Sequence, residues 1–324
     1  DAMENSRDQI REKLERAGRI FFEAADLDIG DTVSDNITIS TMHGCPPDEI
    51  EKIGRYFIAE RRLNTTIKLN PTLLGPDMLR QILNDDLGFS VNVPDLAFEH
   101  DLKYDDGVRL IRNLMADAQK AGVEFNLKLT NTLETTNDRH LLPENESMLY
   151  MSGRPLHVIS MNLADRLQQE FDGGLDISFS AGADCFNLAD ILSCGLKPVT
   201  VCSDILKPGG YGRLAQYLDR TRQQFADANA RSIDDFIQAT AEGAKGNDAV
   251  LHNLSAYAGT VRKDSRYHKT SFPYDDIKTR RSLTAFDCVS APCKGTCPAG
   301  QDVPAYMYHT ARGDFDKAMA AIHI

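Results

Sequence analysis

Three cysteines near the C-terminal end have the spacing of metal-binding thiolates. Cys288, Cys293 and Cys297 follow one another as Cys-x4-Cys-x3-Cys, and Pro298 comes directly after the third. Soft thiolates a few residues apart, followed by proline, are typical of iron–sulfur sites. A cubane cluster needs four ligands, and this stretch supplies three. The motif predicts an iron–sulfur element that takes further ligands from elsewhere, and the alternative is a set of reduced thiols without metal.

A second group of candidate residues lies where two predicted strands end. The stretch 176–210 reads as strand, helix, strand and Gly-rich turn, with glycine or proline at each boundary. Its strands end in the runs SAG at 180–182 and CS at 202–203. Small residues there let a phosphate group approach backbone N–H groups and the N-terminus of the next helix. Since barrels often bind phosphate in the loops after strands 7 and 8, we expect a phosphate site here.

The elements that position these residues alternate along the first 228 residues. Parallel strands follow from successive strand–helix units, which favours an α/β fold. Strands are predicted at 36–40, 65–70, 89–93, 123–132, 176–182 and 198–203, and helices at 1–26, 48–62, 76–84, 107–121, 156–171 and 186–195. A closed barrel needs eight strands. We therefore expect the C-terminal part of a (β/α)8 TIM-type barrel, with its first strands upstream or with 89–93 as an insertion.

The domain organisation follows from these patterns. Residues 1–228 are expected to form the partial barrel, with a long polar loop at 133–152. Residues 229–282 read as a linker, helical at first and irregular from 256 onward. Residues 283–324 are expected to begin a helical iron–sulfur domain. Both ends of the chain fall within helical sequence, so we expect a segment of a longer protein.

Composition restricts the partners and the compartment. The net charge of −12 argues against nucleic acid or an anionic membrane as the main partner. No apolar run approaches the roughly 18 residues of a membrane span. Seven cysteines without a secretory signal indicate thiol or metal chemistry in a cytoplasmic protein more than disulfides.

The cysteine motif resembles a known module. The run DCVSAPCKGTCPAGQDVPAYM at 287–307 is similar to the N-terminal iron–sulfur module of dihydropyrimidine dehydrogenase and of the glutamate synthase small subunit. That module has Cys-x2-Cys-x4-Cys-x3-Cys-Pro, and Ala285 stands here at its first cysteine. The resemblance implies [4Fe-4S] clusters, with Cys288 and Cys293 serving one and Cys297 a second.

The barrel segment resembles the FMN-binding domain of dihydropyrimidine and dihydroorotate dehydrogenases. The motifs are TIKLNP at 66–71, LTNT at 129–132, MSGRP at 151–155, FSAGAD at 179–184 and VCSDI at 201–205. Together with STMHGCPPDEIE at 40–51 and LKPGGY at 206–211, they resemble the YgfK family of iron–sulfur flavoproteins, which carries a selenate reductase label. That resemblance covers nearly the whole chain. It implies a multi-domain parent with an FAD and NAD(P)H domain downstream.

The resemblance also implies roles for individual residues. Lys68 would lie near the pyrimidine ring of FMN, where a cation stabilises the charge of the reduced flavin. Lys128 competes for that role, and a solvated strand-end lysine is the alternative. Asn131 and Thr132 would bind the substrate or the flavin edge. The phosphate and ribityl chain would be surrounded by Gly153, Ser180, Ala181, Gly182, Cys202 and Ser203.

The proton donor departs from the resembled pattern. Dihydropyrimidine dehydrogenases use an acidic cysteine in a barrel loop, and Thr41 stands at that place. Because a threonine hydroxyl is a poor acid near neutral pH, the role would pass to His43 or Cys45. A structural loop histidine and a packing cysteine are the alternatives for these two.

Three functions are open on this evidence. The first is an oxidoreductase that passes electrons from NAD(P)H through FAD and clusters to the barrel. There a small substrate would be reduced, either a pyrimidine- or purine-like heterocycle or, by the family label, selenate. The second is a non-catalytic barrel that serves as a docking or electron-relay scaffold. The third is a barrel lyase that uses Lys68 as a Schiff base.

Overall fold

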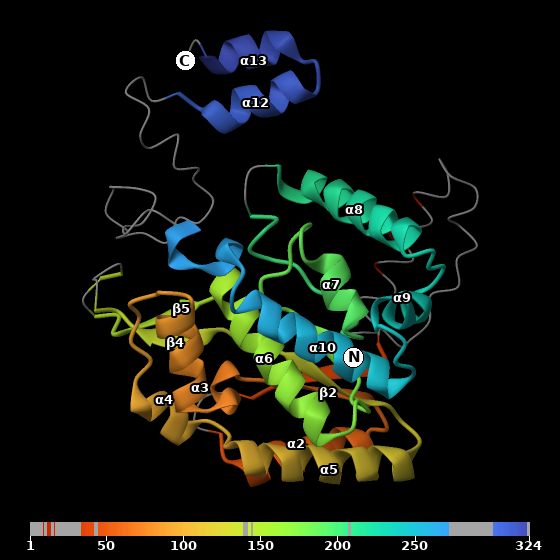
Figure 1. Cartoon of the computed structure of the whole chain (residues 1–324). Helices are drawn as coiled ribbons and strands as arrows, with labels where there is room; N and C mark the ends of the chain where they lie inside the picture. The colour runs from red at the N-terminus through yellow and green to blue at the C-terminus, as the bar shows by residue number, and fades with distance from the viewer. Residues whose placement is uncertain are drawn as a thin grey trace.

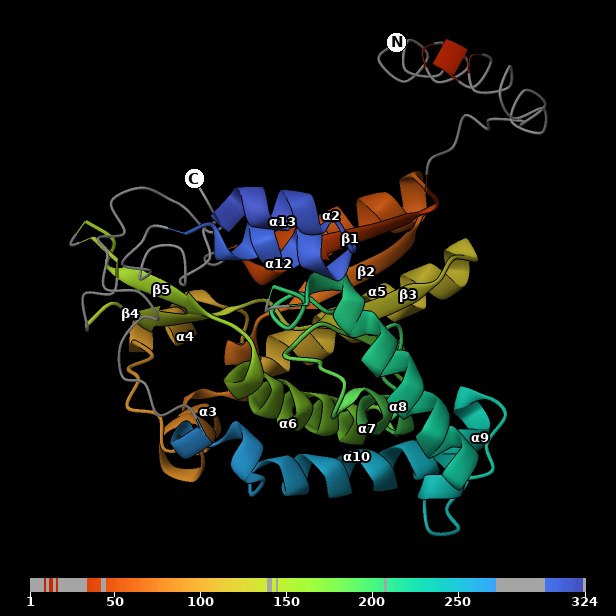
Figure 2. The ribbon, with the colours of Figure 1, turned by 90° about the horizontal axis from the view of Figure 1, so that it is seen from above.

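A four-stranded parallel sheet lies at the centre of the structure, which is a computed structural model. Its strands are β1 (Asn36–Ser40), β2 (Asn64–Leu69), β3 (Phe125–Leu129) and β6 (Ile177–Phe179), in the order β1-β2-β3-β6. Figures 1 and 2 show the strands with helices packed around them. The structure describes residues 34–41, 45–138, 142–143, 145–206, 209–271 and 301–322, with positions 9, 12, 13 and 16.

Alternation along the strands gives the sheet one apolar and one polar face. Ile67 and Leu69 of β2 are fully buried, as are their neighbours on β3, and they pack under the helices. Lys68 lies between them in sequence and therefore points to the opposite face. The register aligns Lys68 with Lys128, and Lys128 with Ser178. The polar face is the one that a closed barrel would turn inward.

The helices follow the strands in the order that the sequence predicts. The sequence from β1 to β3 contains α2 (Pro47–Arg55), η2 (Tyr56–Glu60), η3 (Pro71–Leu74), α3 (Pro76–Arg80), η4 (Gln81–Asp86), α4 (Asp95–His100) and α5 (Tyr104–Ala121). Beyond β3 lie α6 (Arg154–Glu170), α7 (Leu188–Ser193), η5 (Gly210–Arg213), α8 (Leu214–Asp227), α9 (Ile233–Thr240), α10 (Asn247–Val261), η6 (Ser265–Tyr267) and η7 (Lys269–Ser271). The last helices, α12 (Val303–Ala311) and α13 (Phe315–Ile322), pack against each other.

Helix α5 shows why these segments are helical and where they pack. It begins with acidic residues in its first turn and ends at Gly122, which has φ 69°. Its apolar residues recur at helical spacing and include Ile111 and Leu114, both fully buried. Leu114 lies against Gly54 of α2, where a Cβ atom would be only 2.8 Å from it. The glycine thus lets α2 and α5 approach closely on the apolar face of the sheet.

Three predictions of strands and loops are wrong in detail. Residues 89–93 form no strand and run as an irregular connection to α4, in which the Val91 N–H donates to the Phe89 carbonyl at 3.0 Å. The predicted loop at 133–152 contains a hairpin of antiparallel strands, β4 (Leu133–Thr136) and β5 (Met148–Met151). The predicted strand at 198–203 is reduced to one bridge between Phe179 and Val199. Pro198 has no N–H, so the ladder does not extend to the N-terminal side of this bridge.

The segment predicted as a linker is part of the packed structure as far as it is described. Helix α10 lies along α6 (Figure 1). Its residues Leu254 and Val261 are fully buried in the main core, and Tyr267 beyond it is 2% exposed. The irregular structure predicted from 256 onward is therefore wrong up to Val261, where α10 ends. Burial of its apolar side chains keeps this segment in the packed structure, although its sequence is largely polar.

Two further predictions concern the N-terminal helix and membrane spans. The helix predicted at 1–26 lies outside the described residues apart from four positions. In the part of the chain that the structure describes, no helix is long and apolar enough to cross a membrane.

Candidate functional site

The candidate site lies where the carboxyl ends of the parallel strands meet. Loops after β1, β2, β3, β6 and the bridge at Val199 converge there, as the parallel topology requires. In α/β barrels this end carries the ligand site. Two groups of predicted residues lie there among those that the structure describes, one around Lys68 and one around Gly182.

Two lysines lie side by side on the polar face. Lys68 and Lys128 are register partners on adjacent strands and are both partly buried. The Nζ atom of Lys128 donates a hydrogen bond to Thr200 Oγ1 at 3.2 Å. Burial, and then the charge of Lys128, lowers the pKa of Lys68. Among the described residues no carboxylate lies in salt-bridge range of either amine, so the pair is suited to an anion supplied from outside.

The polar character of this face is unusual for a barrel interior. Barrel interiors are commonly filled by layers of branched apolar side chains. Here the residues that share the face with the lysines include Thr66, Asn126 and Ser178. Such a face cannot form a dry core, and it favours a polar ligand.

A hydrogen-bonded clasp joins the ends of the first three strands. Thr41 donates through both its backbone N–H and its hydroxyl to the Lys68 carbonyl, each at 3.0 Å. The Asn131 amide donates to Asn70 Oδ1 at 2.7 Å and accepts from the Ser40 hydroxyl at 2.8 Å. The clasp fixes the backbone at Lys68. It also occupies the Asn131 side chain, whereas Thr132 is exposed.

The surroundings of Thr41 and Cys45 argue against both as proton donors. Thr41 is only 3% exposed and its hydroxyl proton is held by a carbonyl, which argues against a donor role. Burial, followed by the charges of Glu49 and Asp48, raises the pKa of the Cys45 thiol. This makes Cys45 a weaker acid than a free thiol. His43 lies outside the described residues, as do Cys288, Cys293 and Cys297.

The second group is a glycine cradle formed by loops far apart in sequence. Gly182 has φ 60°, and a Cβ atom on it would lie 2.4 Å from the Gly153 carbonyl oxygen. Gly153 has φ 79°, and its Cβ would be 3.9 Å from the Ser203 side chain. Ser203 Oγ in turn is 3.5 Å from Ser152 Oγ. The structure therefore brings together three residues that the sequence assigned to one phosphate site.

The cradle also includes the start of a long helix. Gly153 caps α6, whose 17 residues begin at Arg154 with proline at the second position. The first N–H groups of a helix have no partner within it and favour an anion. No acceptor for the N–H of Gly153 or Gly182 is found in the described part of the chain. Ser180 instead donates to the Leu129 carbonyl at 3.3 Å, while Ala181 is buried and Cys202 is exposed.

Ion pairs that sequence reasoning missed support the cradle. Arg154 pairs with Asp184 at 3.6 Å, and Arg213 pairs with Asp204 at 3.0 Å. The Tyr217 hydroxyl donates to Asp204 Oδ2 at 2.7 Å, and burial together with this bond raises the pKa of Tyr217. The only sequence signal was an aspartate at the end of each of the motifs FSAGAD and VCSD. These pairs neutralise both carboxylates beside a site that would hold phosphate.

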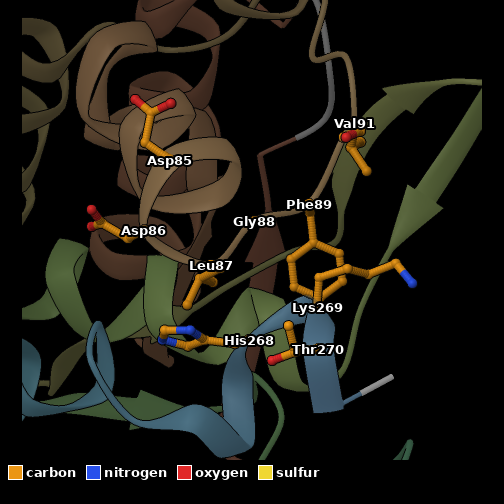
Figure 3. Close-up of a pocket in the computed structure, with 10 residues that line it drawn as sticks. Asp85, Asp86, Leu87, Gly88, Phe89, Val91, His268, Lys269 and Thr270 are labelled. Atoms are coloured by element: carbon orange, nitrogen blue, oxygen red, sulfur yellow. The ribbon is translucent and has the colours of Figure 1, made fainter. Parts of the chain in front are cut away.

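A separate cavity of about 690 Å³ contains none of the predicted site residues. It is lined by residues 85–91 and 268–270 (Figure 3). The Lys269 backbone N–H donates to the Leu87 carbonyl at its wall, at 2.8 Å. The cavity therefore lies between the η4 end and the segment after α10, apart from the strand-end site.

Comparison with known proteins assigns the fold and family. Residues 1–266 match the family described as "Oxidoreductase YgfK, N-terminal TIM-barrel domain". Proteins of Escherichia coli strain K12 and of strain O157:H7, each named "Putative oxidoreductase YgfK", are 40% identical over 272 residues. The match covers 84% of this chain and 24% of each relative, so the chain spans about a quarter of their length. The chain belongs to the YgfK oxidoreductase family and contains its N-terminal TIM-barrel domain.

Proposed function

We propose that this barrel binds FMN at the strand-end site and serves an iron–sulfur flavoprotein oxidoreductase. The observation that carries the proposal is the pairing of Lys68 and Lys128 beside the Gly153–Gly182 cradle. Membership of an oxidoreductase family supports a redox role, and the activity of the whole protein is part of the proposal.

The residues of the site fit a ligand with a phosphate and a second anionic centre. Gly153, Gly182 and Ser203 form a cradle with N–H groups that lack acceptors among the described residues. The two lysines lack a carboxylate partner there and lie on the neighbouring strands. FMN has a terminal phosphate and a ring that gathers negative charge, and when bound it supplies two-electron transfer to a small substrate.

The chain's own residues then have distinct tasks. The cradle holds the phosphate through backbone N–H groups, as glycine-rich turns before helices do. Lys68 and Lys128 provide positive charge for the ring, in a partly buried place where electrostatics are stronger than in water. Thr41 fixes the Lys68 backbone, and Asn131 ties it to the next strand. His43 is the candidate proton donor in this proposal.

The remaining parts of the proposal concern the rest of the protein. Cys288, Cys293 and Cys297 would ligate [4Fe-4S] clusters, and an FAD domain downstream would take electrons from NAD(P)H. The substrate would be a small oxidised N-heterocycle, with selenate as the possibility named by the family label. The protein would act in the cytoplasm, where free thiols stay reduced.

One observation favours a different reaction. The lowered pKa of Lys68 is what a Schiff-base lysine requires. Lys128 supplies the neighbouring cation that can activate such a lysine, but the polar face around the pair is not the apolar pocket of the usual Schiff-base site. Borohydride trapping of a carbonyl substrate on Lys68 would support the lyase.

Titration with FMN tests the proposal. In the full-length protein, Lys68→Met should weaken FMN binding about tenfold or more, since it removes a charged partner from a partly buried site. Lys120→Met is the matched control, because Lys120 is 78% exposed on α5 and pairs only with Asp117 among the described residues. Flavin fluorescence quenching gives both affinities. Equal affinities in the two variants would contradict the assignment, and FAD without FMN would favour the scaffold.

A further inference from the structure

A buried histidine lies directly behind the cradle. His157 of α6 is fully buried, with Nδ1 2.9 Å from the Ala181 carbonyl oxygen and Nε2 3.1 Å from the Tyr257 hydroxyl. A carbonyl can only accept, so Nδ1 carries the proton. Burial lowers the pKa of His157 to about 4, so the ring is neutral and Nε2 accepts from Tyr257. The tautomer is thereby fixed by its two neighbours.

The hydrogen bonds continue from this histidine to the next carbonyl of the same loop. The Tyr257 and Tyr267 hydroxyl oxygens are 3.4 Å apart, and Asn187 Nδ2 donates to Tyr267 at 3.2 Å. The same Asn187 amide donates to the Gly182 carbonyl at 3.1 Å. Since Tyr257 donates to His157, it accepts from Tyr267. The hydrogen bonds therefore run without a break from the Ala181 carbonyl to the Gly182 carbonyl, and the donor of each bond is assigned.

Packing holds the same residues in place. The rings of His157 and Tyr267 stack with centroids 5.1 Å apart and an interplanar angle of 11°. Phe179 meets the histidine edge-on at 5.5 Å. Asn187 is fully buried and Tyr267 is 2% exposed. A fully satisfied buried network of this kind specifies one arrangement of the backbone it contacts.

The orientation of two backbone N–H groups follows from these bonds. In a trans peptide the N–H points opposite to the C=O of the same unit. The Ala181 carbonyl points to His157, so the Gly182 N–H points away from the buried network. The Gly182 carbonyl points to Asn187, so the Ala183 N–H also points away from the buried network. Neither N–H has an acceptor among the described residues.

We propose that His157 is a positioning residue for the loop 181–183. Together with Tyr257, Tyr267 and Asn187, it holds the two carbonyls inward and so presents the N–H groups of Gly182 and Ala183 to the phosphate of the ligand. The identity of that ligand as FMN rests on the function proposed above. The positioning itself depends only on the contacts of the described residues.

Two substitutions of His157 separate positioning from packing. In His157→Asn the side-chain amide nitrogen takes the place of Nδ1 and can still donate to Ala181. In His157→Gln the amide reaches toward Tyr257 and leaves the Ala181 carbonyl without its donor. Both variants lose the ring stacking on Tyr267. They therefore share the loss of packing and differ in the bond that positions the loop.

Ligand affinity in the full-length protein is the first measurement. FMN should bind His157→Gln about tenfold more weakly than wild type, and His157→Asn within about threefold, since one hydrogen bond is at stake. Riboflavin, which lacks the phosphate, should bind both variants as it binds wild type. An equal loss of FMN affinity in the two variants, or a matching loss for riboflavin, would overturn the proposal and indicate a structural role.

Hydrogen exchange without ligand tests the positioning independently of FMN. The backbone N–H groups of Ser180 and Asp184 flank the loop and donate to Leu129 and Asn187. The peptide that contains them should exchange faster in His157→Gln than in His157→Asn. Equal exchange in the two variants would refute the positioning role, whatever the flavin result. Faster exchange combined with no FMN binding by wild type would refute the proposed function and leave the positioning role standing.

Discussion

At the scale of residues, the charged form of Lys68 is unfavourable in the ligand-free protein. Burial and the neighbouring Lys128 lower its pKa, so its charge costs folding free energy at neutral pH. In the unfolded chain the amine binds its proton up to a higher pH, so this cost falls as pH rises through the lowered pKa. Such a cost is reasonable where a ligand supplies the missing anion.

Removing this charge should separate stability from binding. Lys68→Met is expected to stabilise the ligand-free protein by a few tenths of a kcal/mol, a small value because the amine is partly exposed and screened. The same variant should lose FMN affinity. Chemical denaturation with and without FMN checks both signs. A destabilised ligand-free variant would show that Lys68 has a stabilising partner instead.

His157 makes a second prediction, about acid stability. Its pKa of about 4 lies below the usual value of 6.5, so between these pH values the unfolded state binds more protons than the folded state. The contribution of the neutral His157 to the free energy of unfolding is therefore intact above pH 6.5. It is lost as pH falls through the folded pKa, and the total loss is about 3 kcal/mol.

The comparison with His157→Asn isolates this contribution. Asn does not titrate, so wild type should lose about 3 kcal/mol more than the variant as pH falls from neutral to about 4. Asp190, whose pKa burial raises to about 6, gives the opposite slope in both proteins and cancels. Urea denaturation across this range measures the difference. Parallel curves for the two proteins would mean that His157 is not buried in its neutral form.

The sequence grouped several candidate site residues that lie close together in the structure, and it missed the residues that support them. Gly182 and Ser203 were singled out as small residues at strand ends, Gly153 was added by the family resemblance, and the structure brings the three together. His157 and Tyr267 carry no local motif and come from α6 and η6, which are far apart in the sequence. Only the tertiary structure reveals such a network, because no spacing rule links its members.

At the scale of elements, the close approach of two loops depends on one glycine. Gly182→Ala is expected to cost about 2 kcal/mol more than Gly122→Ala, because its methyl group would overlap the Gly153 carbonyl oxygen at 2.4 Å. Gly122 has a similar φ of 69° with nothing within 4 Å of its Cβ position, so it reports backbone strain alone. Denaturation midpoints give both costs. Equal costs would show that the loops can separate freely.

Helix α10 provides a test of the revised segment boundary. Leu254→Ala should destabilise the barrel by about 2–5 kcal/mol, as expected for a fully buried leucine. Leu218→Ala on α8 is the control, since Leu218 is 54% exposed and should change stability little. The measurement is again denaturation. Equal tolerance of both changes would contradict this boundary and would support the predicted linker at 229–282.

The strands show where sequence patterns were informative and where they were not. Strands β1, β2, β3 and β6 were predicted because β-branched and apolar residues alternate between clear breakers. The run at 89–93 has similar residues and Val93 is buried, yet the run forms no ladder with a described strand. Local composition cannot distinguish an irregular connection from a strand, because strand pairing is decided by distant partners.

At the scale of the whole molecule, charge and length set the context of the site. The chain carries a net charge of −12, so Lys68 and Lys128, which form no ion pair with any described carboxylate, are a local exception. The match covers only 24% of each relative. In the proposal, the electron donors and acceptors for the barrel belong to other parts of the protein. The cysteine motif at 288–297 is the sequence feature that suggests them.

Flavin analysis of the full-length protein, purified without oxygen, tests the central claim most directly. We predict about one FMN per chain after acid release, in addition to FAD, because one cradle and one lysine pair define a single site. In Lys68→Met the FMN content should fall while the FAD content stays unchanged. FAD released without FMN from the wild-type protein would contradict the claim that this barrel is a flavin site.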